Sequence, residues 1–245
     1  MCSTEAVVVI ATAPFLSIRP AFRRTIILLL FKHMKLIDLT HPIAPNMPVY
    51  PGTEPPVFIT GCSLEEAGFL EKKITFYSHT GTHIDAPAHL LRGHNTLDML
   101  ALDHFFGSAL LLDFSNVTSK TIGVRELEPH QDTIREVRFL LLHTGWSRYW
   151  GLEKYFINYP VLSLEAANWL SHFDIKGFGL DTISADTADT KEYPVHKALL
   201  RHNIIIIENL TNLANLPGNQ FTFSCFPLSF ADADGSPVRA VAYMA

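Results

Sequence analysis

HTGTHIDAPAH, at residues 79–89, carries the strongest structural and chemical signal in the sequence. Side chains two or four residues apart on an extended strand point to the same face. His79, His83 and Asp85 would therefore converge on one side of a strand, with Gly81 leaving room between them. A helix would turn Asp85 away from the two histidines, and the local threonines and isoleucine favour the strand. The stretch predicts a strand that presents two imidazoles and one carboxylate together.

Such a trio forms a three-ligand metal site with open positions, which suits chemistry on a borderline divalent ion such as Zn²⁺ or Mn²⁺. A single buried histidine is usually a structural residue, but three histidines and an aspartate within eleven residues are costly to bury without a shared ion. The stretch is not an HExxH metalloprotease motif, because it contains no glutamate. His89 could act as a general base or acid, or could be a fourth ligand, and the spacing leaves both open.

Composition narrows the classes of partner. The 245-residue chain is 48% hydrophobic and 18% charged, which indicates a folded protein with room for a compact core. Because it has 19 Lys and Arg against 24 Asp and Glu, nucleic acid is not an expected partner. Cys2, Cys62 and Cys225 form no CxxC pair, which argues against a disulfide framework or a thiolate zinc site and favours a cytoplasmic location.

Residues 1–33 differ from the rest of the chain. They hold two apolar runs, at 6–16 and 26–31, separated by arginines and a proline. Neither run reaches the ~18 residues that a membrane span needs. A secretory signal requires a basic residue before its apolar run, and no basic residue precedes the first run here. We expect an extension outside the fold and no membrane partner, with a marginal signal or a membrane-surface anchor as the alternative. The folded domain is expected to span residues 34–245.

Apolar runs of strand length and segments of helical spacing mix along the rest of the chain, without repeats or a linker. This pattern predicts a single mixed α/β domain. The expected strands are 36–39, 57–60, 73–77, 109–114, 139–143, 175–180, 204–207 and 238–243. Helices are expected from Pro87 onward, over 164–173 and over 195–202, with a turn at 65–68.

Two other kinds of catalytic or binding site are excluded. A serine hydrolase would need a GxSxG elbow, and GWSRY at residues 145–149 lacks the closing glycine. A nucleotide site is not expected either, because GFG at residues 177–179 has no third glycine at GxGxxG spacing and the sequence has no Walker A motif.

Several other residues are candidates of lower weight. His41 could line a pocket from its loop. Asp232 and Asp234 look like turn residues. An aromatic wall could be built from four side chains, although most large aromatics belong to cores; they are Tyr50, Phe69, Phe76 and Trp146.

The stretch at residues 79–89 matches the motif HxGTHxDxPxH without departure, and the chain resembles the metal-dependent cyclase family that carries this motif. The family includes bacterial kynurenine formamidase (arylformamidase) and isatin hydrolase. The further matching segments are residues 38–43, 49–52, 144–146, 179–182 and 234–240. The resemblance covers about residues 34–245, and it implies a single mixed α/β domain of the swivelling β/β/α type.

The resemblance also implies roles for single residues. His79, His83 and Asp85 would bind one metal ion, and His89 would transfer protons. Asp85 would also bind a second metal ion, together with His196 and Glu208. Some relatives use one metal, so one or two Zn²⁺ or Mn²⁺ ions are expected.

His196 and Glu208 show the spacing of the second-metal ligands in the family, with the glutamate twelve residues after the histidine. Composition alone does not single out this pair, which could also be a helix-surface histidine and a carboxylate at the end of a strand. Glu208 nevertheless follows four isoleucines, and a carboxylate directly after a buried strand needs a cation or a donor.

The implied activity is hydrolysis of aryl formamides, most closely the conversion of N-formylkynurenine to kynurenine and formate by a metal-dependent amidohydrolase. An isatin-like cyclic amide or a lactone is the alternative substrate. An inactive metal-dependent binding module is the alternative from another class, and the intact His89 argues against it. The resemblance further implies a small-molecule substrate and a homodimer or homotetramer.

Overall fold

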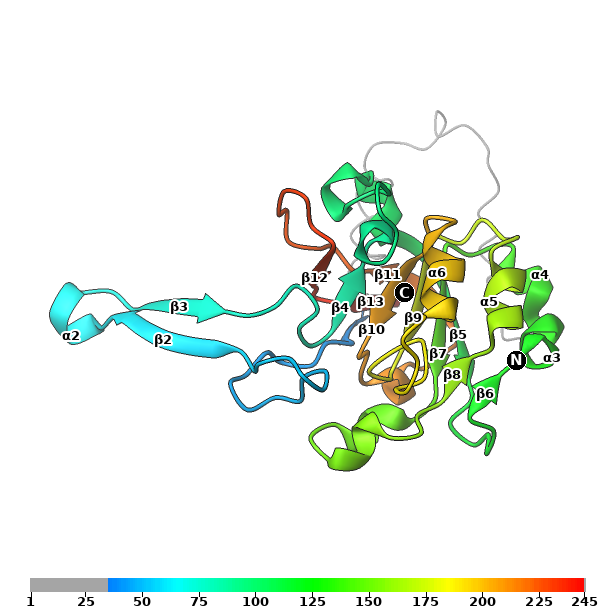
Figure 1. Ribbon diagram of the computed structural model, residues 1–245, viewed down its shortest axis with the longest axis horizontal. Helices are drawn as coiled ribbons and strands as arrows, with labels where there is room; N and C mark the ends of the chain where they lie inside the picture. Colours follow the sequence, from blue (N-terminus) through cyan, green and yellow to red (C-terminus); the bar gives the residue numbers. More distant parts are fainter. Residues whose placement is uncertain (1–34, 245) are drawn as a thin grey trace, which may run out of the picture. The chain divides into compact units, whose positions relative to one another are not determined.

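The computed structural model describes residues 35–244, so the predictions for residues 1–33 lie outside the described residues. A nine-stranded mixed sheet forms the centre of this part of the chain (Figure 1). Its strands, in spatial order, are β1 (Lys35–Asp38), β13 (Val241–Met244), β11 (Gln220–Ser224), β5 (Phe106–Asp113), β7 (Phe139–His143), β9 (Gly177–Leu180), β10 (Ile205–Glu208), β4 (His83–Asp85) and β12 (Gly235–Pro237). β5, β7, β9 and β10 run parallel to one another, with β4 antiparallel to β10 and β11 antiparallel to β5. β12 pairs antiparallel with β4, and β13 pairs antiparallel with β11.

The central strands are buried on both faces, as their continuous apolar runs predict. Alternate residues of a strand point to opposite sides, and here they enter two different cores. Leu140 belongs to a core with residues of the helices, including Leu170 and Leu199. Leu141 belongs to a second core with Ile37 of β1, Ala242 of β13 and other residues near the ends of the sheet. The sheet thus curls so that its own ends cover one face while helices cover the other.

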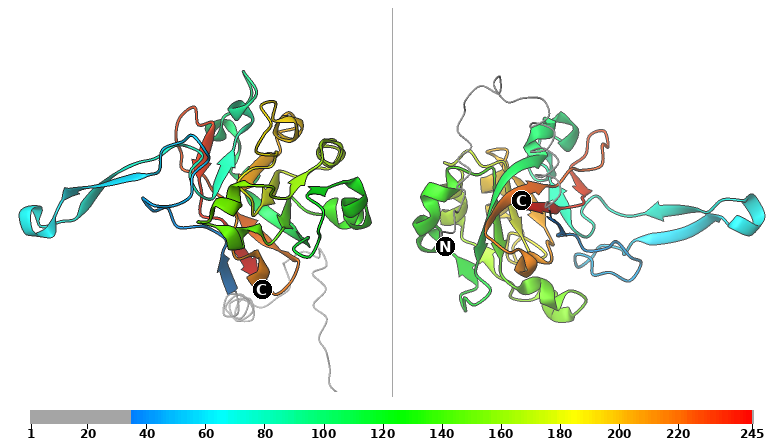
Figure 2. Two further views of the ribbon diagram at one scale, coloured as in Figure 1. Left: turned by 60° about the horizontal axis from the view of Figure 1, so that its bottom comes forward. Right: turned by 180° about the vertical axis from the view of Figure 1, so that it is seen from behind.

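Four helices cover one face of the large sheet (Figures 1 and 2). They are α3 (Val124–Leu127), α4 (Gln131–Ile134), α5 (Leu164–Leu170) and α6 (Pro194–Leu200). Single 3₁₀ turns occupy many of the connections: η2 (Pro87–His89), η3 (Leu97–Met99), η4 (Leu102–Phe105), η5 (Glu128–His130), η6 (Trp146–Tyr149), η7 (Glu153–Phe156) and η8 (Leu213–Asn215). Within residues 35–244, no helix has the length and apolar character needed to cross a bilayer.

Two small sheets accompany the large one. β6 (Thr121–Ile122) pairs with β8 (Val161–Leu162), and β2 (Val57–Cys62) pairs with β3 (Glu71–Thr75). The second pair forms a long hairpin that projects away from the large sheet, with α2 (Leu64–Ala67) at its far end (Figures 1 and 2).

The fold class is the predicted one, but several local predictions are wrong. The expected turn at 65–68 is the helix α2, because the Ser63 hydroxyl accepts a hydrogen bond from the Glu66 N–H and Gly68 closes the helix in a left-handed conformation. The helix expected from Pro87 is only the single turn η2. The last strand starts at Val241 rather than at residue 238, since Val238 instead makes an isolated bridge.

Candidate metal centre

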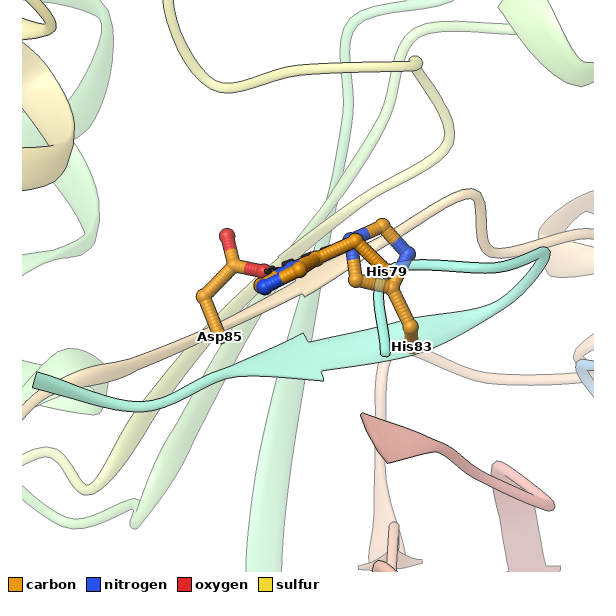
Figure 3. A group of neighbouring side chains, drawn as sticks. All are labelled: His79, His83 and Asp85. Carbon is orange, nitrogen blue, oxygen red and sulfur yellow. Dashed lines mark hydrogen bonds and ion pairs between the residues drawn. The ribbon is translucent and has the colours of Figure 1, made fainter. Parts of the chain in front are cut away.

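Strand β4 places two of the predicted ligands on one face. His83 and Asp85 are its first and last residues, so their side chains point to the same side, and both are buried. His83 Nε2 lies 3.2 Å from Asp85 Oδ1. Figure 3 shows the two side chains rising from the same strand toward a shared point.

His79 reaches this point from a turn, and the prediction of one extended strand over residues 79–85 is wrong. Gly81 has a left-handed backbone (φ +67), which interrupts the extended chain so that the strand begins only at His83. The turn nevertheless brings His79 Nδ1 to 2.6 Å from Asp85 Oδ1 (Figure 3). The ligand atoms of the three residues all lie within 4.8 Å of one another.

His196 and Glu208 lie on the other side of Asp85. His196 is in α6 and Glu208 ends β10, which runs antiparallel to β4 with Glu208 paired to His83. His196 Nε2 is 3.1 Å from Glu208 Oε1 and 3.4 Å from Asp85 Oδ2. The two oxygens of Asp85 therefore face two different groups of side chains, and the second group also lies within 4.8 Å.

The outward ring nitrogens of the three histidines each meet an acceptor. His83 Nδ1 can donate to the Gly81 carbonyl at 2.8 Å. His196 Nδ1 lies 2.7 Å from Asp186 Oδ2, and His79 Nε2 lies 3.0 Å from Asp234 Oδ2. Metal-ligating histidines usually donate their second N–H in this way, which fixes the tautomer and leaves the other nitrogen free to coordinate. The donor set therefore fits a divalent metal ion.

The pKa shifts of the residues at the centre also favour a bound cation. Burial opposes a charge on Asp85, yet the neighbouring histidines hold its pKa well below its ordinary value. Burial alone would lower the pKa of His79, but Asp85 and Asp234 raise it to about 10. The pKa of His196 is also raised, because the surrounding carboxylates outweigh burial. Carboxylates that favour protonated, positively charged histidines this strongly also attract a divalent cation, which would displace the protons from the ring nitrogens.

His89 stands beside this centre at the end of η2. Its ring centroid is 3.9 Å from that of His79, and its Nδ1 lies 3.5 Å from Asp234 Oδ2. Burial lowers its pKa, so the imidazole is neutral near pH 7. His79, His89 and Asp234 also form a third group with ligand atoms within 4.8 Å, so this geometry leaves open both of the roles considered for His89.

Comparison with known proteins identifies the family. Residues 37–187 match the family model Cyclase, a match that covers more than half of the chain. The chain belongs to the Cyclase family. A relative from Bacillus cereus named kynurenine formamidase is 37% identical over 212 residues, which cover 86% of this chain and 98% of the relative.

Solved structures of Cyclase-like proteins share the fold. Isatin hydrolase A from Ralstonia solanacearum is 25% identical, has a TM-score of 0.79 and covers 96% of this chain and 99% of its own. A structure described as a potential metal-dependent hydrolase with cyclase activity is 27% identical, has a TM-score of 0.72 and covers 86% of this chain and 98% of its own.

The candidate centre of this Cyclase family member opens into a cavity of about 400 Å³, a size that suits a small molecule. The residues that line it are Tyr50, Thr53, Tyr77, Ser78, His79, His83, Asp85, His89, Leu90, Ile183, Ser184, Tyr193, His196, Glu208 and Asp234. All six residues predicted for the site are among them.

The four aromatic residues considered for a wall mostly lie outside the cavity, in line with the preference for a structural role. Tyr50 lines the cavity and Phe76 does not, whereas Phe69 is exposed on the projecting hairpin and Trp146 is buried in an apolar cluster with Tyr155. His41 does not line the cavity; it is buried and stacks on Trp150 with 3.9 Å between ring centroids.

Two acidic residues of the centre were missed by the sequence analysis. Asp234 was interpreted as a turn residue, yet it contacts both His79 and His89. Asp186, which holds His196, was not singled out at all. Asp234 lies in a segment that matches the family, which was the one available signal, whereas nothing in the spacing around Asp186 indicates its role.

Proposed function

We propose that this chain is a metal-dependent amidohydrolase that acts on aryl formamides, with conversion of N-formylkynurenine to kynurenine and formate as its reaction. The observation that carries the proposal is the pair of ligand groups that share Asp85 on the wall of a small-molecule cavity. The 37% identity to a protein named kynurenine formamidase, over nearly the whole of that protein, supports the choice of substrate.

His79, His83 and Asp85 would hold one divalent ion, and Asp85, His196 and Glu208 would hold a second. The nitrogen and oxygen donors suit Zn²⁺ or Mn²⁺. When bound, such an ion supplies Lewis acidity and an acidified water molecule.

His89 would move the proton of the reaction. Its Nδ1 faces Asp234, which leaves Nε2 to accept a proton as water adds to the formyl carbon. The same nitrogen then gives that proton to the amide nitrogen as the C–N bond breaks. The products are an aryl amine and formic acid, which releases its proton to solvent and leaves as formate, so atoms and charge balance.

The cavity wall supports an aromatic substrate. The wall has apolar surface next to the polar centre, supplied by Tyr50, Tyr193, Ile183 and Leu90. Pockets of this kind bury a ring while a few polar groups orient it.

The likeness to isatin hydrolase A supports a cyclic aryl amide as the second candidate substrate. Parallel assays of N-formylkynurenine, isatin and an aryl lactone separate these candidates, and metal binding without any turnover would instead indicate a binding module.

Two substitutions test the roles of the histidines. His83→Ala is expected to lose bound metal and turnover of N-formylkynurenine together. His89→Ala is expected to keep the metal and lose about 10²- to 10⁴-fold in kcat, the usual contribution of a general base or acid. The measurements are metal content by mass spectrometry and steady-state kinetics.

His130→Ala is the matched control, because His130 is exposed and lies outside the cavity; it should change neither quantity. Full activity of His83→Ala after chelation would contradict the proposed centre.

Three further predictions remain open to test. We propose that residues 34–245 suffice for the activity, which a chain starting at Met34 tests directly. The cytoplasmic location is checked by fractionation, and the homodimer or homotetramer by sedimentation.

A further inference from the structure

Asn209 follows the candidate ligand Glu208 and is almost fully buried, with 1% of its surface exposed. Its backbone is left-handed (φ +58), a conformation that asparagine adopts more readily than most residues. The chain therefore leaves β10 at Asn209, directly after the position at which Glu208 pairs with His83 of β4. Asn209 thus lies where the ligands of the two proposed ions meet.

Both ends of the Asn209 side-chain amide are hydrogen-bonded. The amide nitrogen Nδ2 donates to the Gly81 carbonyl at 2.8 Å, and the Tyr155 hydroxyl donates to the amide oxygen Oδ1 at 2.7 Å. A backbone carbonyl can only accept, so the amide nitrogen must face Gly81 and the amide oxygen must face the phenol. All three residues are buried, where an unpaired polar atom is costly. The amide therefore has one favourable orientation.

The Gly81 carbonyl also faces the ring of His83. His83 Nδ1 lies 2.8 Å from this oxygen and can donate to it, while Asn209 Nδ2 lies 3.5 Å from the same ring nitrogen. A carbonyl oxygen has two lone pairs and can accept both bonds. Gly81 precedes β4 and lies outside its pairing with β10 and β12. The amide of Asn209 therefore supports the carbonyl group that orients the ring of His83.

Further contacts make this support rigid. The Thr82 hydroxyl donates to the Asn209 carbonyl at 2.6 Å and accepts from the His41 backbone N–H at 2.9 Å. The ring of Tyr155 lies in a buried apolar cluster with Trp146, and the Trp146 indole N–H donates to the Tyr155 carbonyl at 2.9 Å. Burial raises the pKa of the Tyr155 phenol well above its ordinary value, so the hydroxyl stays a donor near pH 7.

We propose that Asn209 is a positioning residue for the metal centre: its side-chain amide, held by Tyr155, keeps the Gly81 carbonyl against the ring of His83. Nδ1 of that ring then donates to the carbonyl, and Nε2 faces the centre, 3.2 Å from Asp85 Oδ1. A hydrogen bond to the second nitrogen of a ligating histidine fixes the orientation of its ring in this way.

Asn209 is joined through the chain to Glu208, so one residue sets ligands of both proposed ions. It does not line the cavity, and it therefore acts through His83 rather than on the substrate. The inference rests on the metal centre of the proposed function, but not on the identity of the substrate.

Replacement by glycine tests the amide without straining the backbone. Asn209→Gly keeps the left-handed turn, which glycine adopts freely, and removes only the side chain. Asn212→Gly is the matched control. Asn212 is also left-handed (φ +59), and its amide donates to the Asp38 carbonyl at 2.9 Å, but it is exposed and lies outside the cavity.

Hydrogen exchange at His83 Nδ1 is measured first, by ¹⁵N NMR of the metal-free proteins, with the resonance assigned by its loss in His83→Ala. We expect slow exchange in the wild type and in Asn212→Gly, because the proton is held between the ring and the Gly81 carbonyl. In Asn209→Gly we expect exchange at least ~10-fold faster, since that carbonyl is no longer supported. This measurement requires neither metal nor substrate.

Metal affinity is measured next, by competition with a coloured chelator. In Asn209→Gly, the affinity of the ion that His83 binds is expected to fall about 10- to 100-fold, the usual effect of removing a group that supports a ligand. At limiting metal, kcat for N-formylkynurenine should fall with it, whereas KM should stay the same because Asn209 does not contact the cavity. Asn212→Gly should change none of these quantities.

Tyr155→Phe removes only the hydroxyl that holds the amide. We expect it to change proton exchange and metal affinity in the same direction as Asn209→Gly, by a smaller factor. The double variant should be no weaker than Asn209→Gly alone, because Tyr155 acts through the amide that is already missing. Additive losses would show that the two residues act independently and would contradict the proposal.

Unchanged proton exchange and metal affinity in Asn209→Gly would overturn the proposal, as would equal losses in Asn212→Gly. Thermal melts show whether each variant is folded. If Asn209→Gly does not fold, Tyr155→Phe provides the same two measurements, and wild-type values in it would overturn the proposal. A wild-type chain that binds metal without hydrolysing N-formylkynurenine would contradict the proposed substrate and leave the role of Asn209 intact.

Discussion

At the residue scale, the position of His196 depends on Asp186. One oxygen of the Asp186 carboxylate accepts a hydrogen bond from the Val195 backbone N–H at 3.0 Å, and the other faces both the backbone N–H and the ring Nδ1 of His196. The carboxylate thus holds the start of α6 and the ring that this helix carries. A carboxylate behind a ligating histidine also raises the basicity of the nitrogen that coordinates the metal.

Substitution of Asp186 therefore has a specific expected effect. Asp186→Asn places an amide N–H against N–H donors, so we expect the affinity of the second metal ion to fall about 10- to 100-fold while the first ion stays bound. Competitive titration of the apoprotein with a coloured chelator measures both affinities.

Asp189→Asn is the control for this substitution, since Asp189 is exposed in the same loop. Equal weakening of both ions by Asp186→Asn, or no weakening at all, would contradict the assignment of His196 to a separate ion.

The residues of the centre differed in how far sequence could reveal them. His79, His83 and Asp85 are close in the chain, so proximity grouped them correctly, although His79 reaches the centre from a turn and not from the predicted strand. His196 and Glu208 were found only through the family resemblance, because their approach to Asp85 depends on the pairing of β4 with β10. Asp234 lies 155 residues from His79, and no local pattern predicts a contact over that distance.

At the scale of elements, strand β9 shows how tightly the sheet is packed beneath the centre. Its sequence GFGL alternates glycine with large apolar residues. A Cβ atom on Gly179 would overlap Leu141 Cδ2 and come to 2.9 Å from Leu210 Cδ1, both of which are buried. The glycine is therefore required by the neighbouring side chains and not by a special backbone angle.

Gly179→Ala is accordingly expected to destabilise the protein by about 1–3 kcal/mol, the usual cost of overpacking a core. Urea denaturation followed by circular dichroism measures the change. Gly218→Ala is the control, because its added methyl group would meet only Met244 Cε at 3.8 Å. A Gly179→Ala variant as stable as this control would show that the strand has more room than the structure indicates.

Elements with strong local signals were predicted well. β7 spans the residues expected of it, because a continuous apolar run between polar ends has clear limits. The short helices and 3₁₀ turns were mostly missed, since a single turn has no hydrophobic period to detect. The extent of the hairpin formed by β2 and β3 was also missed, because its strands were recognised but nothing in their sequence indicates that they leave the large sheet.

At the scale of the whole molecule, the central sheet brings ligands from distant parts of the chain together. β4 carries His83 and Asp85, β10 carries Glu208, and α6 supplies His196 after the crossover from β9. Because these ligands meet only in the folded chain, an ion that binds them stabilises the native state over the unfolded one. Metal removal should therefore lower the melting temperature as well as the activity.

Removal and return of the metal test the central claim most directly. The purified protein is chelated, its metal content is measured, and hydrolysis of N-formylkynurenine is followed before and after Zn²⁺ or Mn²⁺ is added back. We expect the chelated protein to be folded, less stable and inactive. We expect activity to return as the ions bind again to the two ligand groups that share Asp85. Chelated protein that holds no metal and still hydrolyses the substrate at the original rate would contradict this account.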